Sequence, residues 1–183
     1  MLPLITQDTR VLRPEEYEQL RSILKPDFRY QLDGLLFSGM RYVEAVRFQK
    51  NPQWFDNGFI MLPKGSMLKV KAKQKDRTVW LSKLGKKKVP LFLKSDARLP
   101  ARQWFDPRIK IWAEESGLDP KELSAKSLRK TWESWLVATY PNNLTQIALS
   151  QGHDELTQAK HYLNMAFTSH DKTRMKKYVE GWI

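Results

Sequence analysis

Three cationic residues within five positions have the type and spacing to bind a phosphate group. They are Lys126, Arg129 and Lys130, in the stretch KSLRKTWESW (residues 126–135). Side chains at positions i, i+3 and i+4 of a helix share a face, so this stretch predicts a cationic helix face. A pair of Arg129 with Glu133 on an exposed helix is the simpler alternative. The opposite face would anchor the helix in the core through Leu128, Trp132, Trp135 and Leu136.

The distribution of charge indicates a polyanionic partner. The 183-residue chain has 32 Lys or Arg residues against 20 Asp or Glu residues, a net charge of +12. Residues 64–94 alone contain eleven basic residues and a single acidic one, Asp76, so their local net charge is +10. Because neutralising phosphates releases condensed counterions, double-stranded DNA is the first candidate partner and an anionic membrane surface the second.

The basic region has the alternation of a half-buried β-strand. In MLKVKAKQKDRTVWL (residues 67–81), apolar and lysine side chains alternate, and a turn at 74–76 would return the chain as a hairpin with a lysine face. KKKVPLFLK (residues 86–94) would follow as another short strand or a loop. Lysines on an edge strand can also serve only to discourage aggregation. The predicted DNA contacts are Lys69, Lys71, Lys75, Arg77, Lys86, Lys87 and Lys88.

Four segments occur in an order and spacing that resembles the catalytic domain of tyrosine recombinases. They are LLFSGMRYVEAVRF (residues 35–48), the hairpin lysines, KSLRKTW (residues 126–132) and LSQGHDELTQAKHY (residues 149–162), in which His153 and Tyr162 are nine apart. The stretches LRKTWESW, SQGH, HYL and YVEGW are more specifically similar to the integrases of archaeal viruses and plasmids. Each motif alone is weak, and the prediction depends on their conjunction.

The resemblance implies a metal-independent attack on a DNA phosphodiester. Arg41 and Arg129 match the two arginines that bind the nonbridging oxygens, and His153 would add a third hydrogen bond. Tyr162 matches the nucleophile, whose phenol becomes more reactive in a positive field. The product would be a 3'-phosphotyrosine bond that stores the energy for religation, with no cofactor, ATP or metal ion required.

Three lysines and one glutamate stand at the other positions that match the family's active-site pattern. Lys73 matches the hairpin lysine that protonates the leaving 5'-oxygen, although Lys71 and Lys75 are close alternatives. Lys126 stands where histidine is more common, and it can transfer a proton near neutral pH only if its pKa is lowered. Lys130 also replaces a common histidine, so both lysines depart from the family pattern. Glu44 matches the acidic residue that follows Arg41 by three and would support the site.

Other functions remain open at this point. A type IB topoisomerase would share the same residue set, and an accessory protein could bind DNA through the lysine hairpin without chemistry. A metal-dependent nuclease would need clustered carboxylates, which the sequence does not suggest. Tyr178 is the rival phenol, but no Gly-His pair precedes it, and His161 and His170 are expected to be solvated.

The elements that must position these residues are mostly helical. Helices are predicted from Pro14 and Pro26 and over RYVEAVRFQ (residues 41–49). Further helices are predicted at residues 100–116, about 121–139, 143–151, 155–164 and 171–181. Strand-like residues 54–81 interrupt them. We expect an α+β fold, a mainly helical catalytic domain with a small antiparallel sheet or hairpin inserted.

Length and composition limit the expected domain organisation, the possible cysteine chemistry and the expected cellular location. Residues 1–183 are expected to form one catalytic domain without a separate core-binding domain, which self-associates as a dimer or tetramer on DNA. The chain has no cysteine, which excludes disulfides, thiolate zinc sites and a thiol nucleophile. No apolar run approaches a membrane span, so the expected location is the cytoplasm, with the nucleoid, or the host cytoplasm if the protein is viral.

Overall fold

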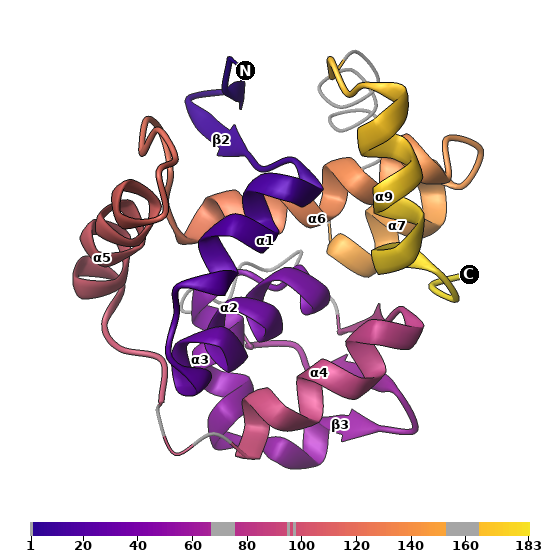
Figure 1. Cartoon of the computed structure of the whole chain (residues 1–183). Coiled ribbons are helices and arrows are strands. Elements are labelled where there is room, and N and C mark those ends of the chain that lie inside the picture. The colour runs from indigo at the N-terminus through magenta and orange to yellow at the C-terminus, as the bar shows by residue number, and fades with distance from the viewer. Residues whose placement is uncertain (1, 67–75, 95, 97, 153–164) are drawn as a thin grey trace.

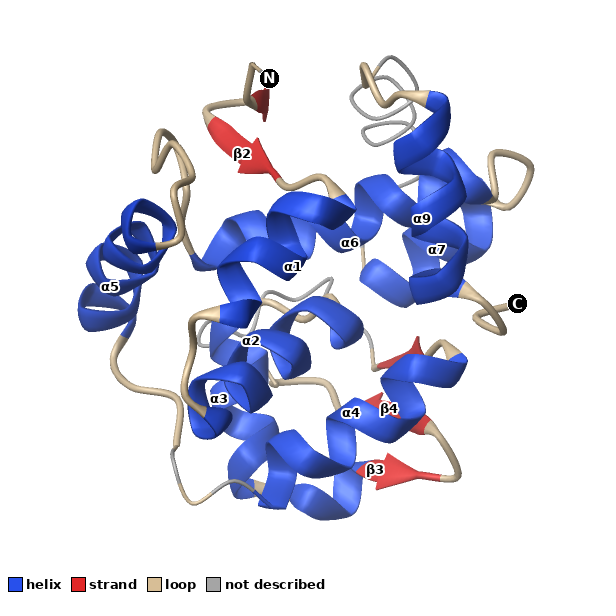
Figure 2. Cartoon of the chain, viewed as in Figure 1, coloured by secondary structure: helices blue, strands red, loops and turns tan. Residues whose placement is uncertain are grey.

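The chain has a mainly helical α+β fold, as the sequence predicts. The computed structural model describes residues 2–66, 76–94, 96, 98–152 and 165–183 (Figure 1). Helices make up most of this part of the chain, and the strands are short (Figure 2). In chain order the elements are β1 (Leu4–Thr6), β2 (Thr9–Val11), α1 (Pro14–Ser22), α2 (Pro26–Ser38), α3 (Tyr42–Lys50), the 3-10 helix η1 (Pro52–Trp54), β3 (Phe55–Asp56), β4 (Phe59–Leu62), β5 (Arg77–Trp80), α4 (Lys83–Lys94), α5 (Arg102–Glu115), α6 (Ala125–Thr139), α7 (Leu144–Gln151) and α9 (Ser169–Val179).

Helix α6 lies at the centre of the core. Trp132 and Trp135 are fully buried in it, as their spacing predicts, and α2, β2 and α9 pack around the helix. The indole N–H of Trp135 donates to the carbonyl of Leu12 (3.0 Å), which fixes the N-terminal segment against the helix. The hydroxyl of Ser127 accepts a hydrogen bond from the backbone N–H of Ser124 (3.0 Å) and so closes the first turn. This rigid element carries Arg129.

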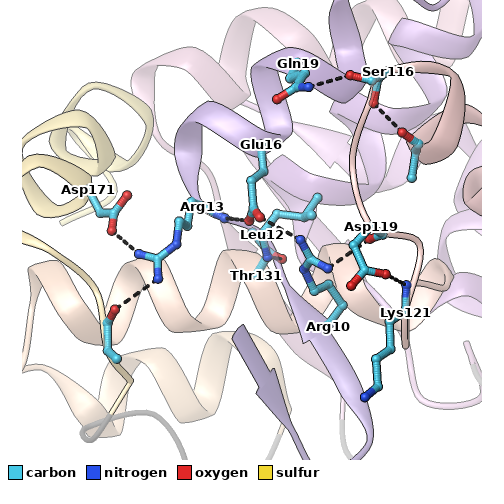
Figure 3. A network of polar contacts seen from close by, with 12 residues as sticks. Arg10, Leu12, Arg13, Glu16, Gln19, Ser116, Asp119, Lys121, Thr131 and Asp171 are labelled. Carbon is cyan, nitrogen blue, oxygen red and sulfur yellow. Dashed lines mark hydrogen bonds and ion pairs between the residues drawn. The ribbon is translucent and has the colours of Figure 1, made fainter. Parts of the chain in front are cut away.

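Two buried arginines attach the N-terminal segment to neighbouring elements (Figure 3). Arg10 donates to the carbonyl of Asp119 (2.9 Å), between α5 and α6, and to Glu16 Oε1 (2.6 Å). Arg13 forms an ion pair with Asp171 in the first turn of α9. Helix α9 and the connection before α6 are therefore both held by residues that come before α1.

Helix α4 corrects a sequence prediction. Residues 86–94 were predicted as a strand or a loop, but they belong to this helix. Gly85, Val89 and Phe92 are buried at helical spacing, and α4 packs closely against α2. The prediction was wrong because the lysine run and Pro90 masked the apolar stripe, although the helix accommodates the proline within its length.

The inserted sheet has three short antiparallel strands in the order β3-β4-β5. Strand β4 pairs with β5 in the register Phe59 to Trp80 and Leu62 to Arg77. The prediction that the chain returns through RTVWL as a strand is confirmed by β5. The outgoing strand predicted at 68–73 lies outside the described residues.

A second sheet, β1 with β2, was not predicted. The two strands pair antiparallel and are joined by Gln7 and Asp8, both with left-handed φ values (47° and 53°). This is the backbone twist that a two-residue hairpin turn requires. Strands of three residues are too short to show a period of two in the sequence.

The other helix predictions that fall on described residues are confirmed by α1, α2, α3, α5, α6, α7 and α9. Helix α6 begins at Ala125 rather than near residue 121, and the predicted helix at 155–164 lies outside the described residues. In the part of the chain that the structure describes, no helix has the length and apolar character needed to cross a membrane.

Candidate active site

Arg129 lies where the C-terminal ends of two helices meet. Its side chain extends from α6 and is only 7% exposed. Nη1 donates to the carbonyl of Gly39, which caps α2 (2.7 Å), and Nη2 donates to the carbonyl of Gln151, the last residue of α7 (2.5 Å). Carbonyls at a helix C-terminus lack intrahelical partners and carry partial negative charge. Two helix ends therefore orient this buried guanidinium.

Arg41 reaches the same end of α7 from a different part of the chain. It is the N-cap of α3, and its Nη2 donates to the carbonyl of Gly152 (3.1 Å). Glu44 fixes the residue twice, because its Oε2 accepts from the backbone N–H of Arg41 (2.8 Å) and its Oε1 from Nη1 (3.2 Å). The two arginines singled out in the sequence thus bind adjacent carbonyls, those of Gln151 and Gly152.

Arg77 adds a third guanidinium that the sequence assigned to DNA contact. It begins β5, donates through Nη1 to the carbonyl of Ser150, and through Nη2 to Glu44 Oε2 (2.6 Å). Its side chain is 11% exposed, so it points inward rather than across a lysine face. We call Arg41, Arg77 and Arg129 the arginine cluster. Its members bind three successive carbonyls, those of residues 150, 151 and 152.

Ser150 is a contributor that the sequence did not reveal. Besides its carbonyl, its hydroxyl accepts a hydrogen bond from the backbone N–H of Trp80 (3.1 Å). The only signal was a small polar residue in the last turn of a predicted helix, just before a Gly-His pair. Such a residue is usually solvated, so the pattern could not identify it.

Two glycines make the arginine cluster sterically possible. Gly39 and Gly152 both have left-handed φ values, 58° and 68°, at the ends of α2 and α7. A Cβ atom at Gly39 would lie 2.5 Å from Gln151 Oε1, and one at Gly152 would lie 2.7 Å from Cδ of Arg77. Both positions therefore require glycine for the backbone conformation and for the close approach.

The cluster is a fixed concentration of positive charge. The pKa of Arg129 is lowered to about 10, chiefly by burial and also by the charges of Arg41 and Arg77, whereas Glu133 and Glu44 oppose the shift. Burial also lowers the pKa of Arg77. Arg129 still carries its proton at neutral pH, because a pKa of about 10 lies well above 7. The cluster has the electrostatic character of an anion site.

Lys126 and Lys130 do not join this cluster, which corrects the prediction of one shared cationic face. Lys130 is 6% exposed, and its ammonium donates to the carbonyl of Thr6 (3.2 Å) and to Gln7 Oε1 (2.9 Å) in the β1–β2 turn. Burial and the nearby Lys126 lower the pKa of Lys130. Lys126 itself is exposed. The neighbours of each side chain, and not helical spacing alone, separate Lys130 from Arg129.

The three successive lysines of α4, which the sequence assigned to DNA contact, also differ in their surroundings. The ammonium of Lys86 lies 5.6 Å from the centre of the Phe59 ring, a cation–π contact. Lys88 forms an ion pair with the buried Asp33 (3.2 Å), whereas Lys87 is exposed. A contiguous run of three lysines thus takes three different environments.

Six of the predicted site residues lie outside the described residues. Gly152, whose carbonyl accepts a hydrogen bond from Arg41, directly precedes His153 in the sequence. Arg77 comes two positions after Lys75 in the sequence. The six are Lys69, Lys71, Lys73, Lys75, His153 and Tyr162.

The rival phenol has a packing role. Tyr178 is 4% exposed, its hydroxyl donates to Glu18, and its ring lies 5.0 Å from that of Trp135. Burial raises the pKa of this phenol, and the hydrogen bond to Glu18 raises it further, which opposes formation of a nucleophilic phenolate. His170 is exposed. Among the described residues, no three His, Asp or Glu side chains gather as they would around a metal ion.

Comparison with solved structures places this arrangement in a known fold. The chain superposes on XerH, a site-specific recombinase bound to a palindromic difH substrate in a post-cleavage complex, with a TM-score of 0.59 over 91% of this chain at 20% sequence identity. A pre-cleavage complex of XerH with difH gives a TM-score of 0.59 over 88% of the chain at 18% identity. The chain has the fold of a tyrosine recombinase catalytic domain.

The similarity has clear bounds. The chain spans about half of the XerH chain, 51% in both complexes. No protein-family model matches the sequence, and no curated protein is similar to it. At this level of identity the likeness establishes the fold, so the function must be argued from the site.

Proposed function

We propose that this chain is the catalytic part of a site-specific DNA recombinase that cleaves and rejoins DNA through a 3'-phosphotyrosine intermediate. The observation that carries the proposal is the meeting of Arg41 and Arg129 on adjacent carbonyls at the end of α7. These carbonyls stand directly before His153 in the sequence. The fold shared with XerH supports the same function.

In the proposed reaction, Arg41 and Arg129 bind the nonbridging oxygens of the scissile phosphate. Each guanidinium has five N–H donors in a planar fork, so a phosphate can be bound while the carbonyl bonds persist. Arg129 is already desolvated and held at both ends by carbonyls, and little reorganisation is needed when charge develops on the phosphate. His153 adds a third hydrogen bond to the pentacoordinate centre.

Tyr162 and a lysine of the basic hairpin carry out the bond exchange. The phenolic oxygen of Tyr162 bonds to phosphorus and its proton leaves to water, while the bond from phosphorus to the 5'-oxygen breaks. Lys73 gives its proton to that oxygen, with Lys71 and Lys75 as the neighbouring alternatives. Rejoining is the same exchange in reverse, so neither ATP nor a cofactor is consumed. A metal ion is not required, because the guanidinium groups neutralise the developing charge.

The remaining lysines act through charge. Lys130 cannot reach the phosphate while its ammonium is bound by Thr6 and Gln7, so we assign it the support of α6 against the β1–β2 turn. Lys126 is exposed beside it and is the candidate for direct interaction with DNA. Glu44 positions Arg41 by accepting hydrogen bonds from its backbone N–H and from its guanidinium.

The partner in this proposal is double-stranded DNA with an attachment-site sequence, bound by a dimer or tetramer. Support comes from the net charge of +12 and from the fold shared with a recombinase solved on its DNA substrate. The stretches LRKTWESW, SQGH, HYL and YVEGW support a finer proposal, an integrase similar to those of archaeal viruses and plasmids.

A nicked suicide substrate tests the proposal directly. We expect a protein–DNA adduct that survives denaturation, and its loss in the Tyr162→Phe variant. Tyr178→Phe is the matched control, because this second phenol is buried and bonded to Glu18. An adduct that persists in Tyr162→Phe and disappears in Tyr178→Phe would contradict the assignment of the nucleophile, and no adduct at all would leave only DNA binding.

A type IB topoisomerase would form the same adduct, so a second measurement separates the two activities. A recombinase joins ends from two DNA molecules and yields recombinant product. Relaxation of supercoiled DNA without recombinant product would instead assign the chain to nicking and closing of one strand.

A further inference from the structure

Arg77 links three parts of the chain that the proposed reaction must align. Its guanidinium joins Glu44, next to Arg41, to the carbonyl of Ser150 at the end of α7. Its side chain also lies directly against Gly152, where a Cβ atom would come within 2.7 Å of both Cδ and Nε. In the sequence, Arg77 also comes two positions after the basic segment 67–75.

Strand β5 and helix α7 are joined at both ends of the strand. Arg77 at its start and the backbone N–H of Trp80 at its end both bond to Ser150, to the carbonyl and the hydroxyl respectively. Two bonds to one residue prevent the strand from sliding along the helix end. The backbone N–H of Trp80 holds the strand beside Ser150, and the Arg77 side chain reaches the carbonyl of the same residue.

Glu44 is shared between two arginines in an unequal way. Its carboxylate is 1% exposed, so it cannot be compensated by water. Oε2 accepts from Arg77 at 2.6 Å, whereas Oε1 lies 3.2 Å from Nη1 of Arg41. The shorter bond is the one to Arg77. The guanidinium of Arg41 makes only the long contact with the carboxylate and a bond to Gly152, while the backbone N–H of Arg41 donates to Oε2 (2.8 Å).

We propose that Arg77 is a positioning residue, which holds the carboxylate of Glu44 so that the guanidinium of Arg41 stays available to the scissile phosphate. Among the described residues, Arg41 and Arg77 form the ion pairs of Glu44, so without Arg77 the buried carboxylate draws Arg41 away from Gly152 into a closed ion pair. This inference rests on the proposed function. It differs from a DNA contact because the charge of Arg77 is paired at 2.6 Å with the buried carboxylate of Glu44, and its side chain is 11% exposed.

The first test is Arg77→Met, measured as the single-turnover rate of adduct formation at saturating DNA. We expect the rate to fall about 100-fold, the effect of misplacing a binding group by roughly 1 Å. When Arg77→Met is added to Arg41→Met, the affinity for DNA and its salt dependence should stay unchanged, because Arg77 itself contacts no phosphate. Urea unfolding of the same sample reports whether the variant is folded.

The decisive test is rescue by a second substitution. In the double variant Arg77→Met with Glu44→Gln, the carboxylate that would capture Arg41 is gone, and the glutamine oxygen can still accept a hydrogen bond from the backbone N–H of Arg41. We expect the rate to recover by at least about tenfold from the single variant, which loss of stability would not produce. The matched control is Arg21→Met, which removes another arginine from a shared buried carboxylate, that of Asp33, and should leave the rate unchanged.

Several results would overturn the inference. One is a drop of about 0.9 in the salt slope of DNA binding when Arg77→Met is added to Arg41→Met, which marks a phosphate contact of Arg77 itself. Another is a folded double variant that is no faster than the single one. If Arg77→Met does not fold, Arg77→Gln replaces it: glutamine can donate hydrogen bonds to Glu44 but supplies no charge to hold the carboxylate, and an unchanged rate would refute the role. A wild-type chain without adduct refutes the proposed function itself, and the inference with it.

Discussion

Two buried carboxylates, Glu44 and Asp33, look alike until their surroundings are compared. Each is 1% exposed and each holds two cations. Both connect elements that are distant in the sequence. The cations are Arg41 and Arg77 at Glu44, and Arg21 and Lys88 at Asp33.

The group around Asp33 is closed. Arg21 uses Nε and Nη2 for both carboxylate oxygens (2.6 and 2.9 Å), the Tyr17 hydroxyl donates to Oδ1, and Lys88 lies 3.2 Å from Oδ2. These donors converge on the carboxylate itself. Burial raises the pKa of Tyr17, and the charge of Asp33 raises it further, which keeps the phenol a donor. Such a group fastens α1, α2 and α4 together.

The group around Glu44 continues beyond its carboxylate. Arg41 and Arg77 each extend a second bond to a carbonyl at the end of α7, where Arg129 joins them. Neutral carbonyls orient guanidinium groups without neutralising their charge. The comparison teaches that a buried ion pair alone does not mark a functional site, whereas several cations gathered on helix ends do.

The largest effect should come from removing the centre of the arginine cluster. We expect Arg129→Ala to slow adduct formation by about 10²–10³-fold, the usual effect of losing one donor to a developing negative charge. Arg129→Lys should be nearly as slow, because an ammonium cannot bridge the carbonyls of Gly39 and Gln151. Single-turnover rates at saturating DNA measure both. A slowing of the same size in Arg21→Met would erase the distinction between the two carboxylate groups.

The helices were predictable because their apolar stripes and their stops are local. The spacing in KSLRKTWESW predicts that both tryptophans of α6 are buried, and Ser38-Gly39 predicts the end of α2. Helix α4 was missed because lysines and Pro90 conceal the spacing of its buried residues. The three-residue strands β1 and β2 leave no period to detect.

The site was predictable by residue type but not by contact. Arg41, Glu44 and Arg129 were named from a resemblance, and the structure brings them to one place. The inward position of Arg77 depends on β5 meeting α7, and the capture of Lys130 depends on the β1–β2 turn. Both are long-range contacts between polar groups, and polar groups follow no sequence period. Local patterns therefore could not separate the structural cations from those of the site.

The second prediction concerns a variant that removes the carboxylate of Asp33 from the closed group. We expect Asp33→Ala to lower the free energy of unfolding by about 3 kcal/mol, because it leaves two cations and a phenol without their acceptor. The value lies at the lower end for a broken buried pair, since Arg21 and Lys88 are 28% and 25% exposed and can regain water. Urea denaturation measures the loss. The rate of adduct formation per folded molecule should stay unchanged, and a slowing of more than tenfold would mean that Asp33 also serves the site.

The last prediction compares two neighbours on α4. Lys87 is exposed, whereas the ammonium of Lys88 is bound by Asp33. If Lys87 contacts a phosphate, Lys87→Ala should reduce the slope of log affinity against log salt by about 0.9, while Lys88→Met should leave the slope unchanged. Fluorescence anisotropy with duplex DNA across a series of salt concentrations measures both. Equal drops in the two variants would show that the ion pair with Asp33 opens on DNA, and an unchanged slope in both would confine phosphate contact to other parts of the chain. Only equal drops would require a new interpretation of the closed group, and neither result would change the interpretation of the arginine cluster.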